Sequence, residues 1–192
     1  MKKSVLIVDG FSGGSHLAAA FINKGFSVLH LQSEAEVWKV VAPSFDFSVY
    51  EENFNLKANS IAEVCKSLKK YHLVAVVPGT ETGVPAADQL SFAFGLRHNS
   101  LEKSSARRNK FEMMKACQKA GLNIGAFIET ADFSDLLKWY QQQHFTRVVL
   151  KPLQSAGTDG VHFCSNVFEL CRAFNEIIGS TSKLGFVNHS LL

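Results

Sequence analysis

The chain has 192 residues, of which 46% are hydrophobic and 19% are charged, and it carries a formal net charge of +3 at pH 7. This composition predicts a globular protein with a packed core, in one domain or two small ones, and excludes a disordered chain. The weak positive charge is spread along the chain, which disfavours nucleic-acid binding, and no apolar run is long enough to cross a membrane.

The cysteines and the N-terminus indicate the cellular compartment. None of the four cysteines stands in a C-x-x-C pair, so we expect buried free thiols rather than a disulfide framework or a zinc site. Lys2 and Lys3 precede an apolar run that Asp9 interrupts, and this run is too short for a secretion signal. We therefore expect a cytoplasmic protein.

The first elements in the chain predict a βαβ unit. Residues 4–8 form a continuous apolar run, which is typical of a parallel strand covered on both faces. A glycine-rich turn leads into a helix over residues 16–24, with Ser15 as its N-cap and Gly25 at its end. A second strand over residues 27–31 completes the unit.

The glycine-rich turn is a candidate dinucleotide site. Its glycines, Gly10, Gly13 and Gly14, do not match G-x-G-x-x-G, and Gln32 and Ser33 stand where an acidic ribose ligand would follow the second strand. The phosphate-binding motif G-x-x-x-x-G-K-[ST] is also missing from the sequence. NAD binding, and with it a Rossmann-type oxidoreductase, is therefore disfavoured.

The next elements lead to a second candidate site. Residues 45–50 alternate like a short strand, residues 61–70 predict an amphipathic helix, and residues 73–77 predict another buried strand, which ends at the loop 78–84. Ligands of open parallel sheets bind outside the carboxyl ends of the strands, so Glu81 in this loop is a candidate to orient an amine-bearing substrate. The alternative, which we favour from the residues alone, is that Glu81 caps the helix that follows the loop.

The second half of the chain follows a polar stretch, and we place a domain boundary near residue 100. Gly95 ends the helix before this boundary, and Gly121 ends the next helix, which carries Lys110. The later apolar patterns predict a strand over 124–130, a helix over 132–144, a strand over 148–150, and a helix that Asn166 caps and that runs through residue 178.

A short loop between two apolar runs is the strongest motif of this half. Residues 151–161 read Lys-Pro-Leu-Gln-Ser-Ala-Gly-Thr-Asp-Gly-Val, between strands predicted at 148–150 and 161–164. A glycine-rich hairpin tip presents successive backbone N–H groups, which form concavities that bind anions such as phosphate, and Lys151 adds a positive charge. The equally weighted alternative is a mobile surface hairpin without a ligand.

The order of these motifs resembles the ATP-grasp superfamily, and within it the L-amino-acid ligases. The resemblance depends on Ala-Arg-Arg-Asn-Lys at 106–110, Ala-Gly-Leu at 120–122, Lys-Pro at 151–152 and the hairpin that follows, and it covers residues 4–192. It implies an α/β fold with a Rossmann-like, pre-ATP-grasp parallel-sheet domain over residues 1–100. The first part of an ATP-grasp domain, with its glycine-rich lid hairpin, would occupy residues 101–192.

The resemblance also implies roles for single residues. Lys110 and Lys151 resemble the lysines that approach the phosphates of ATP, and a loop of the Glu81 kind borders the substrate side in these ligases. The lid itself would consist of Ser155, Ala156, Gly157, Thr158 and Gly160. The resemblance implies a reaction that joins a small carboxylate and an amine, with amino acids as the substrates, through an acyl phosphate, and that uses ATP with Mg²⁺.

The implied metal ligands and adenine hinge are expected beyond residue 192. After the lid, the acidic residues are Glu169 and Glu176, and the solvated face of a helix explains both. We therefore expect the chain to be the N-terminal part of a longer ligase, incompetent alone. The alternative is a non-catalytic module, derived from ATP-grasp, that binds a nucleotide or a partner. A homo-oligomer is compatible with the sequence.

Overall fold

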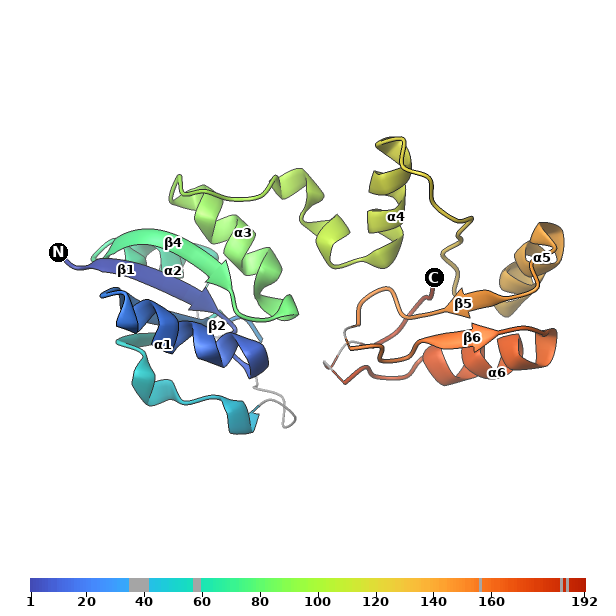
Figure 1. Ribbon diagram of the computed structural model, residues 1–192, viewed down its shortest axis with the longest axis horizontal. Coiled ribbons are helices and arrows are strands. Elements are labelled where there is room, and N and C mark those ends of the chain that lie inside the picture. Colours follow the sequence, from blue (N-terminus) through green and yellow to red (C-terminus); the bar gives the residue numbers. More distant parts are fainter. Residues whose placement is uncertain (35–41, 57–59, 156, 184, 186) are drawn as a thin grey trace. The chain divides into compact units, whose positions relative to one another are not determined.

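The computed structural model describes residues 1–34, 42–56, 60–155, 157–183, 185 and 187–192. The chain divides into two compact units, Met1–Ser104 and Ser105–Leu192. Each unit has its own sheet and its own helices (Figure 1).

Unit 1 contains a four-stranded sheet in which all neighbouring strands are parallel and the order is β3-β2-β1-β4. The strands are β1 (Lys3–Val8), β2 (Ser27–Gln32), β3 (Glu52–Asn55) and β4 (His72–Pro78). The run over residues 4–8 is thus an inner strand, as its continuous apolar sequence predicted. An inner parallel strand packs on both faces, so it needs apolar side chains on both.

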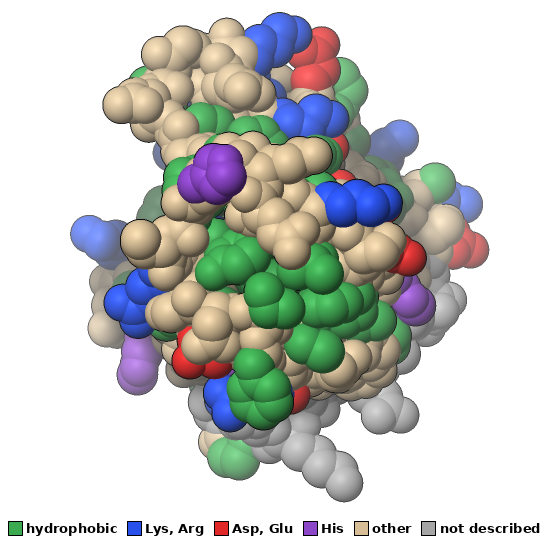
Figure 2. Space-filling view, turned by 90° about the vertical axis from the view of Figure 1, so that its right-hand side faces the viewer, with side chains coloured by type: hydrophobic (Ala, Val, Ile, Leu, Met, Phe, Trp, Pro, Cys, Tyr) green, Lys and Arg blue, Asp and Glu red, His purple; other side chains and the backbone are tan. Residues whose placement is uncertain are grey.

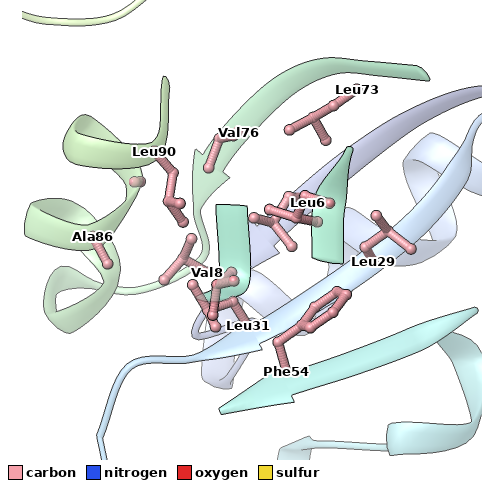
Figure 3. Close-up of a cluster of buried hydrophobic side chains, with 12 residues drawn as sticks. Leu6, Val8, Leu29, Leu31, Phe54, Leu73, Val76, Ala86 and Leu90 are labelled. Atoms are coloured by element: carbon pink, nitrogen blue, oxygen red, sulfur yellow. The ribbon is translucent and has the colours of Figure 1, made fainter. Parts of the chain in front are cut away.

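Three α-helices cover the two faces of this sheet: α1 (Ser15–Asn23), α2 (Ile61–Leu68) and α3 (Val84–Ala93). Leu6 and Val8 of β1 belong to one hydrophobic cluster, together with side chains of α2 and α3 (Figure 3). Val5 and Ile7 belong to a second cluster, which includes Ala18 of α1. The alternation follows from the two-residue period of a strand, and it divides the core of unit 1 into two layers.

The segment between β2 and β3 differs from the prediction. The expected strand over residues 45–50 is instead a short 3-10 helix, Phe47–Val49, and β3 begins at Glu52. Asp46 precedes the 3-10 helix, and its carboxylate accepts hydrogen bonds from the backbone N–H and the hydroxyl of Ser48. Such local bonds compete with a strand ladder, which explains why apolar alternation alone gave the wrong element.

The start of α1 also differs from the prediction. A 3-10 helix, Ser12–Gly14, leads directly into α1, and the N-cap of α1 is Gly14, without a side-chain bond. The Ser15 hydroxyl donates back to the carbonyl oxygen of Ser12 at 2.6 Å. Ser15 is therefore the first residue of the helix rather than its cap.

Unit 2 pairs a two-stranded antiparallel sheet with three helices. Its elements are α4 (Lys110–Lys119), α5 (Phe133–Gln143), β5 (Val148–Leu150), β6 (His162–Cys164) and α6 (Val167–Ile177). β5 and β6 form the predicted hairpin, with Val148 opposite Cys164 and Leu150 opposite His162. Their buried side chains join Leu136, Leu170 and further apolar residues in one hydrophobic cluster.

The strand predicted over residues 124–130 is wrong. Of these residues, only Thr130 makes a β-type pairing, an isolated bridge to Leu191, and Leu191 also bridges Pro152. The N–H groups of Thr130 and Leu191 each donate to the carbonyl oxygen of the other, at 3.1 and 3.0 Å. The apolar Ile128 instead packs against the hydrophobic cluster of unit 2, so its sequence signal came from burial and not from a strand. Among the described residues, no helix has the length and apolar character that a membrane span requires.

Candidate functional site

Within unit 2, the start of α4 contacts the loop of the β5–β6 hairpin, residues 151–161. The side chain of Asn109 caps the helix by accepting hydrogen bonds from the N–H groups of Phe111 and Glu112, so Lys110 is the first helical residue. The backbone N–H of Lys110 donates to the carbonyl oxygen of Leu153 at 3.0 Å. Its ammonium group donates to the carbonyl oxygen of Ser155 at 3.2 Å and to the hydroxyl of Ser155 at 3.0 Å. Lys110 and Ser155, 45 positions apart in sequence, therefore lie together.

The loop of the β5–β6 hairpin contains three left-handed positions, two of which are consecutive. Gly157, Thr158 and Gly160 have φ angles of 62°, 61° and 68°, which suit glycine and strain threonine. A Cβ on Gly160 would lie 2.7 Å from Cγ of Pro152, so this position admits only glycine without a shift. The carboxylate of Asp159 accepts a hydrogen bond from the N–H of Lys183 at 2.7 Å. Ala156, the remaining predicted lid residue, lies outside the described residues.

Lys151 is fixed by its backbone at the end of β5. Its N–H donates to the carbonyl oxygen of Leu192, and the N–H of Leu192 donates to the carbonyl oxygen of Lys151, both at 2.9 Å. The half-buried Lys151 lines a pocket of about 290 Å³ that lies within unit 2. The structure thus brings Lys110 to Ser155 and places Lys151 against this pocket instead.

The pocket is mostly apolar, and the sequence analysis did not find it. Its walls include Phe127, Trp139, Val149 and the charged side chain of Arg147. The guanidinium of Arg147 lies over the ring of Phe163, 4.7 Å from the ring centre. Figure 2 looks onto the side of Figure 1 where α5 and α6 lie, and it shows hydrophobic side chains gathered in one patch with Lys and Arg side chains around it. The sequence of β5 is a continuous apolar run, so it gave no signal that Val149 would be exposed between two buried residues.

In unit 1, the loop after β4 carries Glu81 at the carboxyl edge of the sheet. Glu81 begins a 3-10 helix, Glu81–Gly83, and its side chain is exposed. The N-cap position of α3 is Gly83, which makes no side-chain bond, and Glu81 is the acidic residue in the first turn of the 3-10 helix that leads into α3. The position outside a parallel strand is the one where open α/β sheets bind ligands.

A buried carboxylate lies beside this loop, and the sequence analysis assigned it no role. Asp9 follows β1, is 0% exposed, and accepts hydrogen bonds from Ser33 and Thr82. An aspartate directly after a buried strand was the signal that could have drawn attention to it. The described residues contain no group of three or more His, Cys, Asp or Glu side chains that could hold a metal ion.

Comparison with known proteins gives one relative in sequence and several in structure. No family model matches the chain. Dapdiamide A synthase of Enterobacter agglomerans is 33% identical over 193 residues, an alignment that covers 100% of this chain and 45% of that protein.

Solved structures resemble this chain in fold. The L-amino acid ligase of Bacillus licheniformis superimposes with a TM-score of 0.68 at 18% identity, over 92% of this chain and 41% of that one. Carboxyaminoimidazole ribonucleotide synthase of Aspergillus clavatus, solved with ATP, gives a TM-score of 0.66 at 15% identity, over 99% of this chain and 46% of that one.

The chain thus spans less than half the length of each of these proteins. The α/β fold and the family resemblance that the motifs predicted are both confirmed. Over its whole length, the chain resembles part of dapdiamide A synthase in sequence and part of the ATP-grasp ligases in fold.

Proposed function

We propose that this chain is the N-terminal part of an ATP-dependent carboxylate–amine ligase, and that unit 2 contributes the phosphate clamp for ATP. The observation that supports this proposal best is the contact between the Lys110 ammonium and Ser155 of the glycine-containing loop. An ammonium held against a loop of left-handed residues combines a positive charge with backbone N–H groups, which is the combination that binds phosphate.

The clamp that we propose uses Lys110 and Lys151, with the lid residues Ser155, Gly157, Thr158 and Gly160. Ser155 offers Lys110 only neutral oxygen atoms, so a phosphate oxygen would be a stronger partner for the same ammonium. Lys151 is placed by its paired backbone, which leaves its side chain to meet a second phosphate oxygen. Ala156 belongs to the proposed lid by its place in the sequence alone.

The proposed reaction has two steps. A carboxylate oxygen of the first substrate attacks the γ-phosphorus of ATP, the bond to the β-phosphate oxygen breaks, and ADP leaves with an acyl phosphate remaining. The amine nitrogen of the second substrate then attacks the acyl carbon, phosphate leaves, the nitrogen loses a proton, and an amide forms. The two ammonium groups would stabilise the negative charge on the phosphoryl group during transfer, and a closed lid would keep water from the acyl phosphate.

Substrates and metal belong to this proposal as well. We propose amino acids as the acid and the amine, supported by the names of dapdiamide A synthase and the L-amino acid ligase, with Glu81 orienting the amine. ATP-dependent phosphoryl transfer uses Mg²⁺, but the described residues do not form a group that fits this ion, so we assign it no ligand in this chain. The free cysteines suit the reducing conditions of the cytoplasm, which we propose as the compartment.

The phosphate clamp is tested by ATP binding to the full-length enzyme. We expect Lys110→Met and Lys151→Met each to weaken ATP binding about tenfold or more, since a hydrogen bond to a charged group contributes roughly 1.5–3 kcal/mol. Lys115→Met is the matched control, because Lys115 lies on the same helix and pairs with Glu112 on an exposed surface. Unchanged ATP affinity in both lysine variants would remove the clamp from the proposal.

The reaction itself is tested with an isotope. The full-length enzyme is given ATP, Mg²⁺ and pairs of proteinogenic amino acids, with ¹⁸O in the carboxylate of one of them. An acyl-phosphate mechanism transfers one ¹⁸O atom to the released phosphate and yields a new amide, both of which mass spectrometry detects. ATP binding without ADP release for any pair would instead favour the non-catalytic module.

A further inference from the structure

The buried carboxylate of Asp9 holds together three chain segments at the carboxyl edge of the sheet in unit 1. Asp9 follows β1, Ser33 follows β2, and Thr82 lies in the loop after β4. One carboxylate oxygen accepts the backbone N–H of Ser33 at 2.7 Å, and the other accepts the hydroxyls of Ser33 and Thr82, the latter at 2.6 Å. In the described part of the chain these donors are all neutral, so a charged group is buried without a cation.

Burying such a charge is unfavourable, which indicates that this position does more than fill the core. The backbone of Asp9 is also in an uncommon state, with a φ of 54° in the left-handed region. Its N–H donates to the carbonyl oxygen of Leu31 at 2.8 Å, and its carbonyl oxygen accepts the N–H of Phe11 at 2.8 Å. The surrounding hydrogen bonds therefore fix the direction of the Asp9 side chain.

In the loop after β4, the hydroxyl groups of two threonines form a chain of hydrogen bonds in which the direction of each donor is defined. The Thr82 hydroxyl lies 3.0 Å from the Thr80 hydroxyl and 2.6 Å from the carboxylate of Asp9. A hydroxyl has one proton to donate, and Thr82 donates its proton to the carboxylate of Asp9, so Thr80 is the donor in its contact with Thr82. Both neighbours of Glu81 in the sequence are thus tied through one chain of hydrogen bonds to Asp9.

The backbone of the loop packs directly on the end of β1. A Cβ on Gly79 would lie 2.5 Å from the carbonyl oxygen of Asp9, and a Cβ on Gly83 would lie 2.5 Å from that of Val8. The N–H of Gly79 donates to the same oxygen of Val8 at 2.7 Å. Between the two anchored threonines, Glu81 is exposed.

We propose that Asp9 is a positioning residue, which holds Glu81 through Thr82 in the orientation that receives the amine of the substrate. This inference rests on the proposed ligase function and adds to it a residue that does not itself touch the substrate. This role explains why a carboxylate is buried at this position. The carboxylate accepts hydrogen bonds from two hydroxyls and one N–H, and so joins the three segments that follow β1, β2 and β4.

The test replaces the donor and keeps its shape. In the full-length enzyme, Thr82→Val removes the hydroxyl at nearly constant volume, and we expect the KM of the amine substrate to rise about tenfold, the size expected for a lost hydrogen bond to a charged group. The KM of ATP should change less than about twofold, and Thr82→Ser should restore the amine KM. Ser91→Ala is the control, since it removes another buried hydroxyl of unit 1, which donates to the carbonyl oxygen of Val76 at 3.4 Å.

The outcomes distinguish a failure of the positioning role from a failure of the proposed ligase function. If the unaltered enzyme forms amides and Thr82→Val leaves the amine KM unchanged, or raises both KM values equally, the positioning role is wrong and the ligase function stands. If the unaltered enzyme releases no ADP with any amino-acid pair, the ligase function fails and the role toward a substrate falls with it. Amide hydrogen exchange then measures the loop alone, since Thr82→Val should speed exchange at Gly83, whose N–H donates to the carbonyl oxygen of Thr80.

Discussion

At the scale of single residues, His30 has the most unusual environment in unit 1. It lies in β2, is 0% exposed, and neither ring nitrogen has a hydrogen-bond partner among the described residues. Its ring is surrounded by the aromatic rings of Phe11, Phe45, Phe47 and Tyr50. Burial lowers the pKa of His30 to about 4, and the nearby side chain of Asn53 opposes this shift only partly.

The lowered pKa predicts that acid destabilises unit 1. The unfolded chain binds the proton at a pKa near 6.5, whereas the folded chain binds it only near 4, so stability is lost as the pH falls between these values. We expect the free energy of unfolding to drop by about 2 kcal/mol between pH 7 and pH 5 from this residue alone. Urea unfolding at both pH values measures the drop.

The same experiment on two variants identifies the source of the pH dependence. His30→Leu should remove most of the drop and leave unit 1 at least as stable at pH 5, because the leucine buries no polar atom. His72→Leu is the control, since His72 is exposed at the start of β4. An equal loss of stability at pH 5 with and without His30 would contradict the assignment.

At the scale of secondary-structure elements, the start of α6 is fixed by a hydrogen bond between residues close in sequence. The side chain of Asn166 accepts the N–H of Glu169 at 2.9 Å, which confirms the predicted cap. Asn166→Ala should lower the stability of unit 2 by about 1 kcal/mol, because an N–H at the helix start loses its partner. Asn175→Ala makes the same change on an exposed position of the same helix and should be neutral or slightly stabilising. Chemical denaturation compares the two, and equal losses would contradict the cap's role.

Leu191 closes the core of unit 2 from a distant point in the sequence. It is 0% exposed, belongs to the hydrophobic cluster of unit 2, and pairs by its backbone with Thr130 and Pro152. We expect Leu191→Ala to reduce the free energy of unfolding by roughly 2–5 kcal/mol, the usual range for a leucine removed from a packed core. The exposed Leu122 provides the control, since Leu122→Ala should change the midpoint of urea unfolding little. If Leu191→Ala lowered the free energy of unfolding by less than about 1 kcal/mol, the backbone pairing of residue 191, rather than its side chain, would hold this segment on unit 2.

The predictable elements were those whose signal lies within their own sequence. The inner strand β1 and the β5–β6 hairpin followed from apolar runs, and the cap of α6 followed from one asparagine. β3 and the extended stretch near Thr130 were missed or misassigned because their pairing depends on residues far along the chain. The same limit applies to the site: the motifs gave Lys110 and Ser155, but their contact, the pocket beside Lys151 and the hydrogen bonds of Asp9 depend on the folded chain.

At the scale of the whole molecule, the hydrophobic clusters divide with the units. Every residue of the two clusters in unit 1 lies before Ser104, and every residue of the cluster in unit 2 lies after it. A fragment of residues 1–104 should therefore fold alone and unfold cooperatively in urea, as circular dichroism can measure. A fragment of residues 1–78 is the control, because it lacks Ala86, Ala87 and Leu90 of α3, and it should show no cooperative transition. If the longer fragment behaved like the shorter one, unit 1 would not be an independent folding unit.

The pairing of Leu191 with Thr130 and Pro152 sets an order of events on the ribosome. Unit 1 has its full set of core residues once the chain has emerged past Ser104, whereas unit 2 waits for residue 191. At translation rates of about 5–20 residues per second, this delay is on the order of ten seconds. During that time α5, β5 and α6 lack the leucine that completes their core, so the apolar surface of nascent unit 2 stays exposed after the core of unit 1 is complete.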